Sequence, residues 1–312
     1  MTQPSPLIIR HFQKEDMPLL GELYQSVTAN KHAEFWWVGD EENWENVYCA
    51  FEHGKMIAKG QISVIGLVPP GQPESERHSL FVNLKTLPER EKDGDLLDLL
   101  YHCLLDRAVE LQKDLPPQYR TQLCMGNDSS EAANTDFFIQ KGFRHLNSLY
   151  RMIRPLSEPV PELALPEGFQ FSRWRMETAA EENEYLAAET EIWPAGLHRM
   201  AEYKANQKWT SMVVRHEGVL AASVMAWLED DHGVIEDVFV RKPWRQQGLA
   251  RFLLAQGLRY LVSFGTPYAS LMVETGNKSA LSLYESVGFQ PDREELRYFI
   301  LLDEATEAGK KL

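Results

Sequence analysis

Four prolines lie among the twelve residues from 155 to 166 and divide the chain of 312 residues into two halves. Proline fixes one backbone dihedral and lacks the N–H donor, so this segment can form neither a helix nor a central strand. The same order of elements begins on either side of it, a short apolar strand (residues 7–11 and 169–174) and then an acidic helical stretch. Two domains of about 150 residues, joined by a proline-rich linker, are therefore predicted.

In the second half, apolar runs predict a β-hairpin at residues 209–215 and 220–228, because His216-Glu217-Gly218 between them can form a tight turn. The remaining elements expected are a strand at 233–240, a helix at 251–264, a strand at 269–274, a helix at 277–286 that ends before Gly288, and a strand at 296–302 that closes the half.

The first half repeats this pattern. Residues 138–143 (Phe-Ile-Gln-Lys-Gly-Phe) parallel residues 284–289 (Tyr-Glu-Ser-Val-Gly-Phe). We interpret the repeat as an internal duplication. Its elements are a hairpin at 46–51 and 56–65, a strand at 79–87 and a helix at 96–111.

The net charge argues against several kinds of partner. With 32 lysines and arginines against 46 aspartates and glutamates, the formal charge is −14, whereas nucleic acids and anionic membranes require clustered positive charge. A cationic ligand suits this balance better, although an acidic surface also serves solubility alone. With no signal-like start and no apolar run near the ~18 residues of a membrane span, a cytoplasmic protein is expected.

The three cysteines, Cys49, Cys103 and Cys124, all lie in the first half and lack the spacing of metal ligands. Neither a disulfide framework nor a metal site is expected, and the second half has no cysteine nucleophile.

The run from Arg245 to Ala250 (Arg-Gln-Gln-Gly-Leu-Ala) joins a predicted strand to a predicted helix. The first N–H groups of a helix have no partners within it and carry the positive end of its dipole, so they bind anions. Gly248 and the small Ala250 let a ligand approach the backbone, and Arg245 adds a charge suited to phosphate. The turn therefore predicts a site for a ligand that carries a pyrophosphate.

The strand Ile235-Glu236-Asp237-Val238-Phe239-Val240, this turn, and the later Asn277 and Tyr284 together resemble the GNAT superfamily of acetyltransferases. The resemblance covers residues 168–303 well and the first half only as a degenerate copy. It implies an α/β fold of two tandem GNAT-like domains, each a central, mostly antiparallel mixed sheet flanked by helices. The boundaries expected are 1–155 for a degenerate, non-catalytic domain, 156–167 for the linker, 168–303 for the catalytic domain and 304–312 for a tail.

The resemblance further implies acetyl-CoA as co-substrate. Backbone groups of Val238 and Val240 would pair with its pantetheine arm, and Asn277 would contact the same region. Ala250 departs from the glycine more common in the family, which is a frequent variant. The full set of residues implied to bind the cofactor is Val238, Phe239, Val240, Arg245, Gln246, Gln247, Gly248, Leu249, Ala250, Asn277 and Tyr284.

GNAT enzymes usually transfer the acetyl group directly to an amine in a ternary complex, which requires a base and an acid. Glu236 is the first candidate for the base and Asp237 the second. The resemblance also implies a bulge in this strand, which would shift the alternation of side chains and could exchange the two. Tyr284 is the candidate acid for the departing thiolate, although a tyrosine on an apolar helix face can also belong to the core. An amide near Val238 would polarise the thioester carbonyl.

The first half departs from the family pattern. Asp93 and Asp95 fall where the second half has Gly248 and Ala250, and two carboxylates would repel a diphosphate. Phe138 replaces the candidate acid. One active site is therefore expected, with the first half as a scaffold, a dimer surface or part of the substrate wall. Its residues 35–42 could line a cleft for a cationic ligand or pack on their own core.

The predicted function is acetyl-CoA-dependent N-acetylation of a primary amine on a small cationic molecule or peptide, by a monomer or homodimer. Tandem GNAT chains of this size resemble self-resistance acetyltransferases that inactivate amine-rich antibiotics. The alternatives are thiol-cofactor biosynthesis, as by mycothiol synthases, a non-catalytic acyl-CoA-binding regulator, and an aminoacyl-tRNA-dependent transferase. The candidate carboxylates for the acceptor are Glu229, Asp230, Asp231, Glu236 and Asp237.

Overall fold

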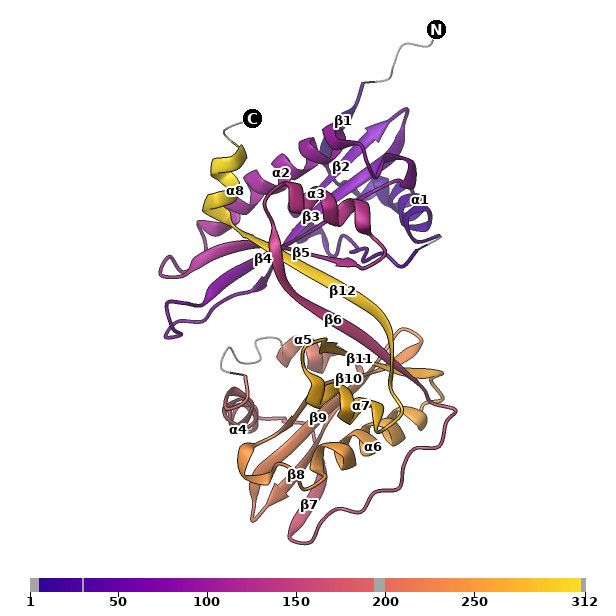
Figure 1. Cartoon of the computed structure of the whole chain (residues 1–312), viewed down its shortest axis with the longest axis vertical. Coiled ribbons are helices and arrows are strands. Elements are labelled where there is room, and N and C mark those ends of the chain that lie inside the picture. Colours follow the sequence, from indigo (N-terminus) through magenta and orange to yellow (C-terminus); the bar gives the residue numbers. More distant parts are fainter. Residues whose placement is uncertain (1–5, 30, 194–199, 310–312) are drawn as a thin grey trace. The chain divides into compact units, whose positions relative to one another are not determined.

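The computed structural model describes residues 6–29, 31–193 and 200–309, which form two compact units. Unit 1 comprises residues 1–148 and 295–312, and unit 2 comprises residues 149–294. Figure 1 labels the helices and strands of both. The last strand of each half is exchanged, so that each unit is completed by a strand from the other half of the chain.

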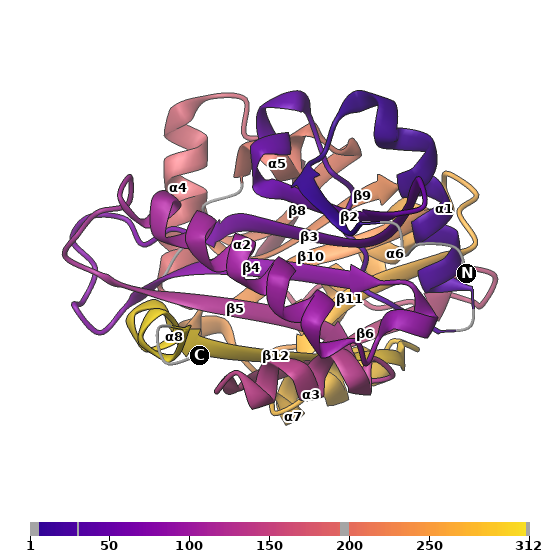
Figure 2. The same ribbon diagram turned by 90° about the horizontal axis from the view of Figure 1, so that it is seen from above.

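Unit 1 has the strand order β1-β2-β3-β4-β5-β12, and every pair is antiparallel except β4 with β5. In Figure 2, α2 lies across β3 and β4. The bounds are β1 Ile8–His11, α1 Met17–Thr28, β2 Val47–Glu52, β3 Lys55–Gly66, β4 Arg77–Thr86, α2 Gly94–Gln112, β5 Arg120–Asp128, α3 Ala132–Gln140, β12 Gln290–Leu301 and α8 Leu302–Gly309, with short 3-10 turns at Lys14–Asp16, Glu41–Asn46 and Pro88–Arg90.

Unit 2 has the strand order β6-β11-β10-β9-β8-β7, with β10 and β11 parallel and its other pairs antiparallel. Its bounds are β6 Arg144–Pro155, β7 Phe169–Trp174, α4 Ala179–Thr190, α5 Met200–Ala205, β8 Gln207–His216, β9 Val219–Glu229, β10 His232–Val240, a 3-10 turn at Lys242–Trp244, α6 Leu249–Val262, β11 Tyr268–Glu274 and α7 Lys278–Glu285. Of β6, the residues from 149 onward belong to this unit.

Two apolar cores lie on the two faces of the unit 2 sheet. One contains the buried side chains of α6 and α7, and the other contains those of α4 and α5. Helix α6 packs closely on β10 because two glycines leave room: a Cβ on Gly233 would lie 2.6 Å from Leu261, and one on Gly257 would lie 2.8 Å from Ile235. This contact fixes the start of α6 relative to the end of β10.

The predicted hairpins, strands and helices are confirmed within a few residues, but the domain boundaries at 155, 168 and 303 are not those of the structure. The strand expected at 296–302 does not close the second half, because it pairs with β5, from Glu295 opposite Asp128 to Leu301 opposite Gln122. In its place β6 pairs with β11 and buries Met152 in the core of unit 2.

The expected linker and tail are also structured parts of the units. In the linker, Val160, Leu163 and Leu165 pack against the core of unit 2. In the tail, residues up to 309 form α8, whose Leu302 and Ala305 are buried in unit 1. Residues 310–312 lie outside the described part.

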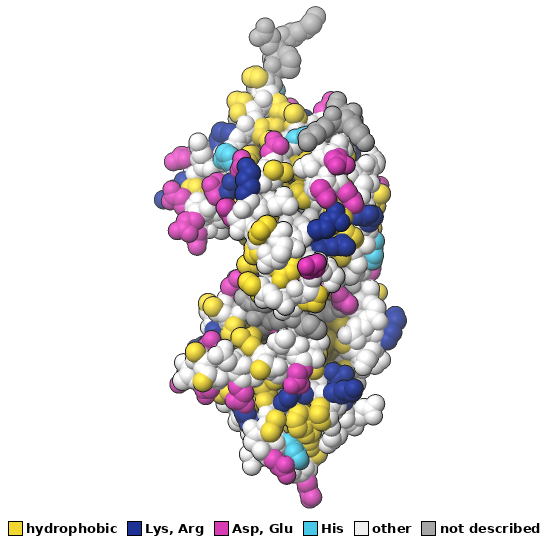
Figure 3. Space-filling view, turned by 90° about the vertical axis from the view of Figure 1, so that its left-hand side faces the viewer, with side chains coloured by type: hydrophobic (Ala, Val, Ile, Leu, Met, Phe, Trp, Pro, Cys, Tyr) yellow, Lys and Arg dark blue, Asp and Glu magenta, His cyan; other side chains and the backbone are white. Residues whose placement is uncertain are grey.

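On the face shown in Figure 3, acidic and basic side chains are mixed over both units. Within the described ranges, no helix is both long and apolar enough to cross a membrane.

Candidate active site

The two parallel strands of unit 2 separate after a short common stretch. Over the described residues, β10 pairs with β11 only at Gly233 opposite Ala269 and at Val234 opposite Ser270, while β11 stays paired with β6 as far as Glu274. Main-chain and side-chain groups of β10 beyond Val234 are therefore available to line cavities.

A β-bulge interrupts β10 at this point. Its register with β9 shifts between Glu236 and Phe239, and Asp237 has a φ of 49°, which is uncommon for a residue with a side chain. The bulge confirms the irregularity expected in this strand, and it gives the two neighbouring acids different surroundings.

The turn after β10 leaves the start of α6 open. Gly248, with φ 79° and ψ 2°, is the N-cap, and no side chain in the described part of the chain caps the helix there. The first helical bond runs from the Phe252 N–H to the Gly248 carbonyl at 3.0 Å, so the N–H groups of the three residues between them have no partner in the helix. These groups and the helix dipole make an anion site.

A groove of about 630 Å³ runs from this turn to α7. Gln247 is exposed and does not line it, whereas Ile192 and Trp193, at the end of α4, line it without any signal in the sequence to indicate this. The predicted cofactor residues that line the groove are Val238, Phe239, Val240, Arg245, Gln246, Gly248, Leu249, Ala250, Asn277 and Tyr284.

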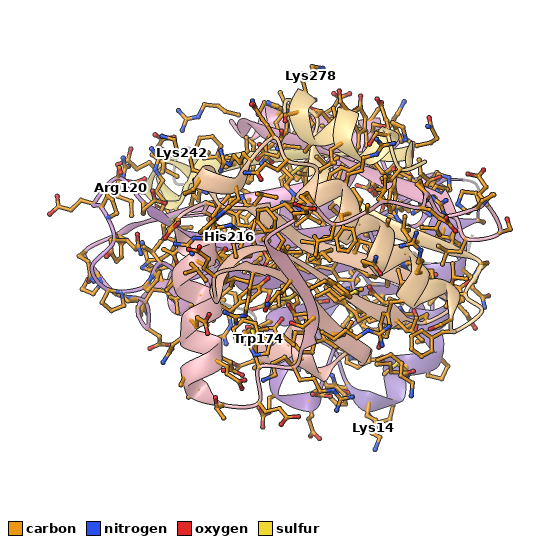
Figure 4. The ribbon with its side chains drawn as sticks, turned by 90° about the horizontal axis from the view of Figure 1, so that it is seen from below. Lys14, Arg120, Trp174, His216, Lys242 and Lys278 are labelled. Carbon is orange, nitrogen blue, oxygen red and sulfur yellow. The ribbon has the colours of Figure 1, made fainter. Side chains whose placement is uncertain are left out.

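Some polar groups at the groove already have partners within the chain. The Nε of Arg245 donates to the Val240 carbonyl at 3.0 Å, and the Oδ1 of Asn277 accepts the Ala280 N–H at 3.1 Å as the N-cap of α7. Near the groove, Lys242 and Lys278 lie at the periphery in Figure 4, with Lys278 projecting outward.

Tyr284 lies in the last turn of α7 and lines the groove, with a side chain that is 8% exposed. Burial raises the pKa of its phenol to about 12, and the charges of Glu236 and Asp237 add to this effect. The hydroxyl therefore keeps its proton at neutral pH and can act as a donor.

Glu236 lines a second cavity of about 560 Å³, together with Glu229 from β9 and Glu202 from α5. Arg151 and His232 also line this cavity, which we call the acidic cavity because its three glutamates outnumber its one arginine. Tyr203 and Trp227 also line it and stack on each other, with ring centroids 5.1 Å apart. Of the predicted acceptor carboxylates, the structure brings Glu229 and Glu236 together here, and Asp230, Asp231 and Asp237 do not line the cavity. The contribution of α5 was missed because no motif connects it to β10.

Asp237 instead accepts a hydrogen bond from the hydroxyl of Tyr185 on α4, a fully buried side chain. Burial raises the pKa of this carboxyl to about 6, and the Tyr185 hydroxyl opposes the shift. Asp237 lines neither cavity, so the bulge places one carboxylate at the acidic cavity and bonds the next to Tyr185.

Residues 173–289 match the profile of the Acetyltransferase (GNAT) family. This segment is a GNAT domain. Acetyl-CoA is the co-substrate of the acetyltransferases of this family. The uncapped start of α6 and the groove that leads from it to Tyr284 fit such a ligand.

Curated relatives match about half of the chain. A mycothiol acetyltransferase of Thermobispora bispora is 30% identical over 165 residues, covering 47% of this chain and 55% of the relative. One of Salinispora arenicola is 27% identical over 175 residues, covering 48% and 54%. The chain thus spans about half the length of the curated relatives it matches.

The likeness to solved structures extends over both halves. A GCN5-related N-acetyltransferase from Sphaerobacter thermophilus has a TM-score of 0.72 at 18% identity, over 96% of this chain and 97% of the other. A tandem GNAT protein from the clavulanic acid biosynthesis pathway has a TM-score of 0.68 at 12% identity, over 95% and 99%. At such identities the likeness shows the fold, and it confirms the predicted tandem GNAT architecture.

The corresponding turn of unit 1 is closed by its own side chains, unlike that of the GNAT domain. Asp93 is the N-cap of α2, where its Oδ1 accepts the Leu96 N–H at 3.1 Å. Arg90 forms ion pairs with Asp93 at 2.6 Å and with Glu52 at 2.7 Å. At the start of α2, a carboxylate and its paired guanidinium therefore occupy the place that no side chain caps at the start of α6.

Side chains also fill the region where β4 and β5 separate, beyond the pair Val82 and Met125. Asn134 donates from Nδ2 to the Leu84 carbonyl at 3.1 Å and accepts from Asn127 at 2.9 Å. Phe138, at the position of Tyr284, is 1% exposed among other aromatic rings.

The aromatic and acidic stretch at residues 35–42 packs on its own unit, as one of the two expectations had it. Buried Asn83 bonds both the Glu34 carbonyl, at 2.5 Å, and the Trp36 N–H, at 3.3 Å. Buried Lys59 donates to the Trp36 carbonyl. These bonds hold the backbone of the stretch against β3 and β4.

Proposed function

We propose that the chain acetylates a primary amine of a small cationic molecule with acetyl-CoA, at a single site in its GNAT domain. The observation that carries this proposal is the position of β10 between two cavities. The groove that starts at α6 lies on one side of its bulge, and the acidic cavity lies on the other. Tyr284 lines the groove and Glu236 lines the cavity. An anionic acyl donor and a cationic acceptor would therefore approach each other at this strand.

The groove offers a place for each part of acetyl-CoA, which would supply the acetyl thioester. The first N–H groups of α6 and the guanidinium of Arg245 would hold the pyrophosphate. Backbone groups from Val238 to Val240 and the side chain of Asn277 would contact the pantetheine arm. The Val240 carbonyl already accepts from Arg245, so the other backbone groups of this stretch would carry the pairing.

Glu236 would act as the base, directly or through a water. An amine of pKa ~10.4 is neutral in about one molecule in 2,500 at pH 7, so removing its proton costs roughly 4.6 kcal/mol. Glu236 lies in the cavity that would receive the ammonium group. Asp237 is the weaker candidate because its carboxylate is bonded to Tyr185 and lines neither cavity.

Tyr284 would act as the acid. Its pKa of about 12 keeps the phenol protonated at neutral pH. Glu236 first takes a proton from the ammonium group, and the neutral nitrogen then bonds to the acetyl carbon. The carbon–sulfur bond breaks, the phenol proton passes to the sulfur, and the second proton lost by the nitrogen restores the phenol. A main-chain N–H near Val238 would stabilise the oxyanion that forms on the acetyl oxygen.

The acidic cavity supports a cationic acceptor. The three carboxylates of Glu202, Glu229 and Glu236 exceed the one positive charge of Arg151 and would attract an ammonium group. The stacked rings of Tyr203 and Trp227 offer an apolar surface beside them. A second candidate function is the acetylation of a thiol-cofactor precursor. It is favoured by the mycothiol acetyltransferases among the curated relatives.

The test is to incubate the protein with acetyl-CoA and a panel of polyamines, aminoglycosides, basic peptides and amines that carry a free thiol. Mass spectrometry would then detect the addition of one acetyl group. Tyr284→Phe should lower kcat by about 10²-fold or more while acetyl-CoA still binds. Turnover confined to the thiol-bearing amines would favour the second candidate. Binding of acetyl-CoA without turnover on any amine would favour a regulator and contradict the proposal.

A further inference from the structure

Arg154 is the largest fully buried side chain among the described residues of the chain, with 2% of its surface exposed. It lies on β6, the strand that the first half of the chain contributes to unit 2. Burying a guanidinium is costly unless its N–H groups find acceptors. Burial accordingly lowers the pKa of Arg154.

Four backbone carbonyls accept hydrogen bonds from the Arg154 guanidinium. Its Nε donates to Val287 at 2.7 Å and its Nη1 to Pro155 at 3.1 Å, while its Nη2 donates to Pro159 at 2.9 Å and to Glu158 at 3.5 Å. The first carbonyl lies in the turn after α7, and the other three lie at the start of the proline-rich segment. One side chain thus ties β6 and this segment to the end of the helix that carries Tyr284.

The turn after α7 is itself bonded to Tyr284. The N–H groups of Val287 and Phe289 both donate to the Tyr284 carbonyl, each at 3.1 Å. Gly288 between them has a φ of 95°, and a Cβ at this position would lie 2.9 Å from the Nε of Arg154. The guanidinium therefore packs against the glycine and bonds the carbonyl before it.

A second arginine shows what helix capping alone requires. Arg251, on α6, donates to the Ser286 carbonyl at 3.3 Å and contacts the same end of α7 from an exposed position. Its positive charge already complements the helix dipole. Arg154 differs because it is buried, reaches the turn from another strand and contacts the glycine that ends the helix.

We propose that Arg154 is a positioning residue for the acetyl transfer proposed above. It fixes the turn after α7 and so directs the Tyr284 phenol into the groove. The inference rests on the proposed function, since it concerns the acid of that reaction. Under this proposal, the first half of the chain supplies the strand that orients the acid of the GNAT domain.

A double-mutant cycle in the full-length protein tests this. Arg154→Met should lower kcat about tenfold to a hundredfold, because a displacement of about 1 Å at a reacting group has such an effect. The dissociation constant for acetyl-CoA should stay within about twofold. Arg154→Lys should restore part of kcat. In the Tyr284→Phe background, Arg154→Met should have no further effect on kcat, because a residue that acts through Tyr284 has nothing left to position.

The matched control is Arg259, whose Nη2 donates to the Pro161 carbonyl at 2.7 Å. Among the described residues, Arg259 has no hydrogen bond to α7. Arg259→Met removes an arginine bond to the same proline-rich segment and should leave kcat unchanged. If Arg154→Met does not fold, Arg154→Lys and Gly288→Ala enter the same cycle, since an alanine Cβ would push against the Arg154 Nε.

Two results would overturn the inference while leaving the proposed function standing: wild-type kcat in a folded Arg154 variant, or an equal loss of kcat in the two backgrounds. Absence of turnover by the wild-type protein on every amine would instead remove the proposed function, and this inference with it.

Discussion

The buried hydroxyl of Tyr185 donates a hydrogen bond to the carboxylate of Asp237, while the residue before it, Glu236, lines the acidic cavity. The bulge in β10 produces this separation, because it breaks the alternation of side chains at the point where the two acids meet. The sequence leaves these adjacent acids as alternatives for one role, that of the base. In the structure they have different surroundings, and each acid can be tested separately.

Asp237→Asn should become more stable relative to the wild type as pH rises. The pKa of Asp237 is about 6 in the folded protein, above the ordinary 3.8 of an aspartate in water, so the folded protein binds the proton more tightly and the stability from this group is lost as pH increases. Between pH 4.5 and 7 the difference in unfolding free energy should change by about 2 kcal/mol. Urea unfolding of both proteins at several pH values measures it. A constant difference would show that the carboxyl is not perturbed.

Glu236→Gln should lower kcat/KM at pH 7 by about 10²-fold or more, because it removes the proposed base but keeps the shape of the side chain. Its rate should then rise about tenfold per pH unit toward the pKa of the amine, since the reaction would depend on amine that is already neutral. Steady-state rates from pH 6 to 10 measure this. The comparison is Glu229→Gln in the same cavity, which should mainly raise the KM for the amine. A wild-type pH profile in Glu236→Gln would assign the proton transfer to another group.

Gly248→Ala should weaken acetyl-CoA binding about tenfold and cost roughly 1 kcal/mol of stability, because alanine is strained at a φ of 79°. A Cβ at Gly248 would meet no atom within 4 Å, so the effect would come from the backbone and the approaching ligand. Gly94, which opens α2 in unit 1 without a positive φ and also has no atom within 4 Å, is the matched control. Gly94→Ala should leave the dissociation constant unchanged in calorimetry. Equal effects of the two variants would mean that the α6 turn does not bind the ligand.

The parts of the fold that the sequence predicted correctly depend on local signals. Gly248 starts α6 in the left-handed conformation, Asn277 caps α7, and Gly288 ends it at a positive φ. Each is a residue whose side chain, or lack of one, suits one backbone position. The bulge at Asp237 was expected from the family resemblance.

The features that were not predicted depend on contacts between distant segments. Strands β6 and β12 could each have joined either sheet edge, because strand pairing leaves no mark in the local pattern of apolar residues. Glu202 reaches the acidic cavity from a six-residue helix that no motif connects to β10. The positioning role proposed for Arg154 rests on its four backbone acceptors, which lie up to 133 residues away.

One acetyl-CoA should bind per chain. Unit 1 repeats the fold of the GNAT domain, but Asp93 takes the N–H group of α2 that a phosphate would require, and Asn134 takes the Leu84 carbonyl in the region where β4 and β5 separate. Asp93→Ala should cost about 1 kcal/mol of stability through loss of the cap. It should not create a second site, because Asn134 stays in place. Isothermal titration should give one equivalent for both proteins.

The reciprocal change is Ala250→Asp, which puts a carboxylate at the start of α6, as Asp95 does at the start of α2. The new charge would face the pyrophosphate in the first turn of the helix. Repulsion between these like charges would exceed the attraction of the helix dipole, which contributes roughly 0.3 to 1 kcal/mol. Binding should therefore be lost in calorimetry while the melting temperature changes little. A second equivalent in the wild type, or undiminished binding by Ala250→Asp, would mean that a carboxylate at this position does not decide which unit binds acetyl-CoA.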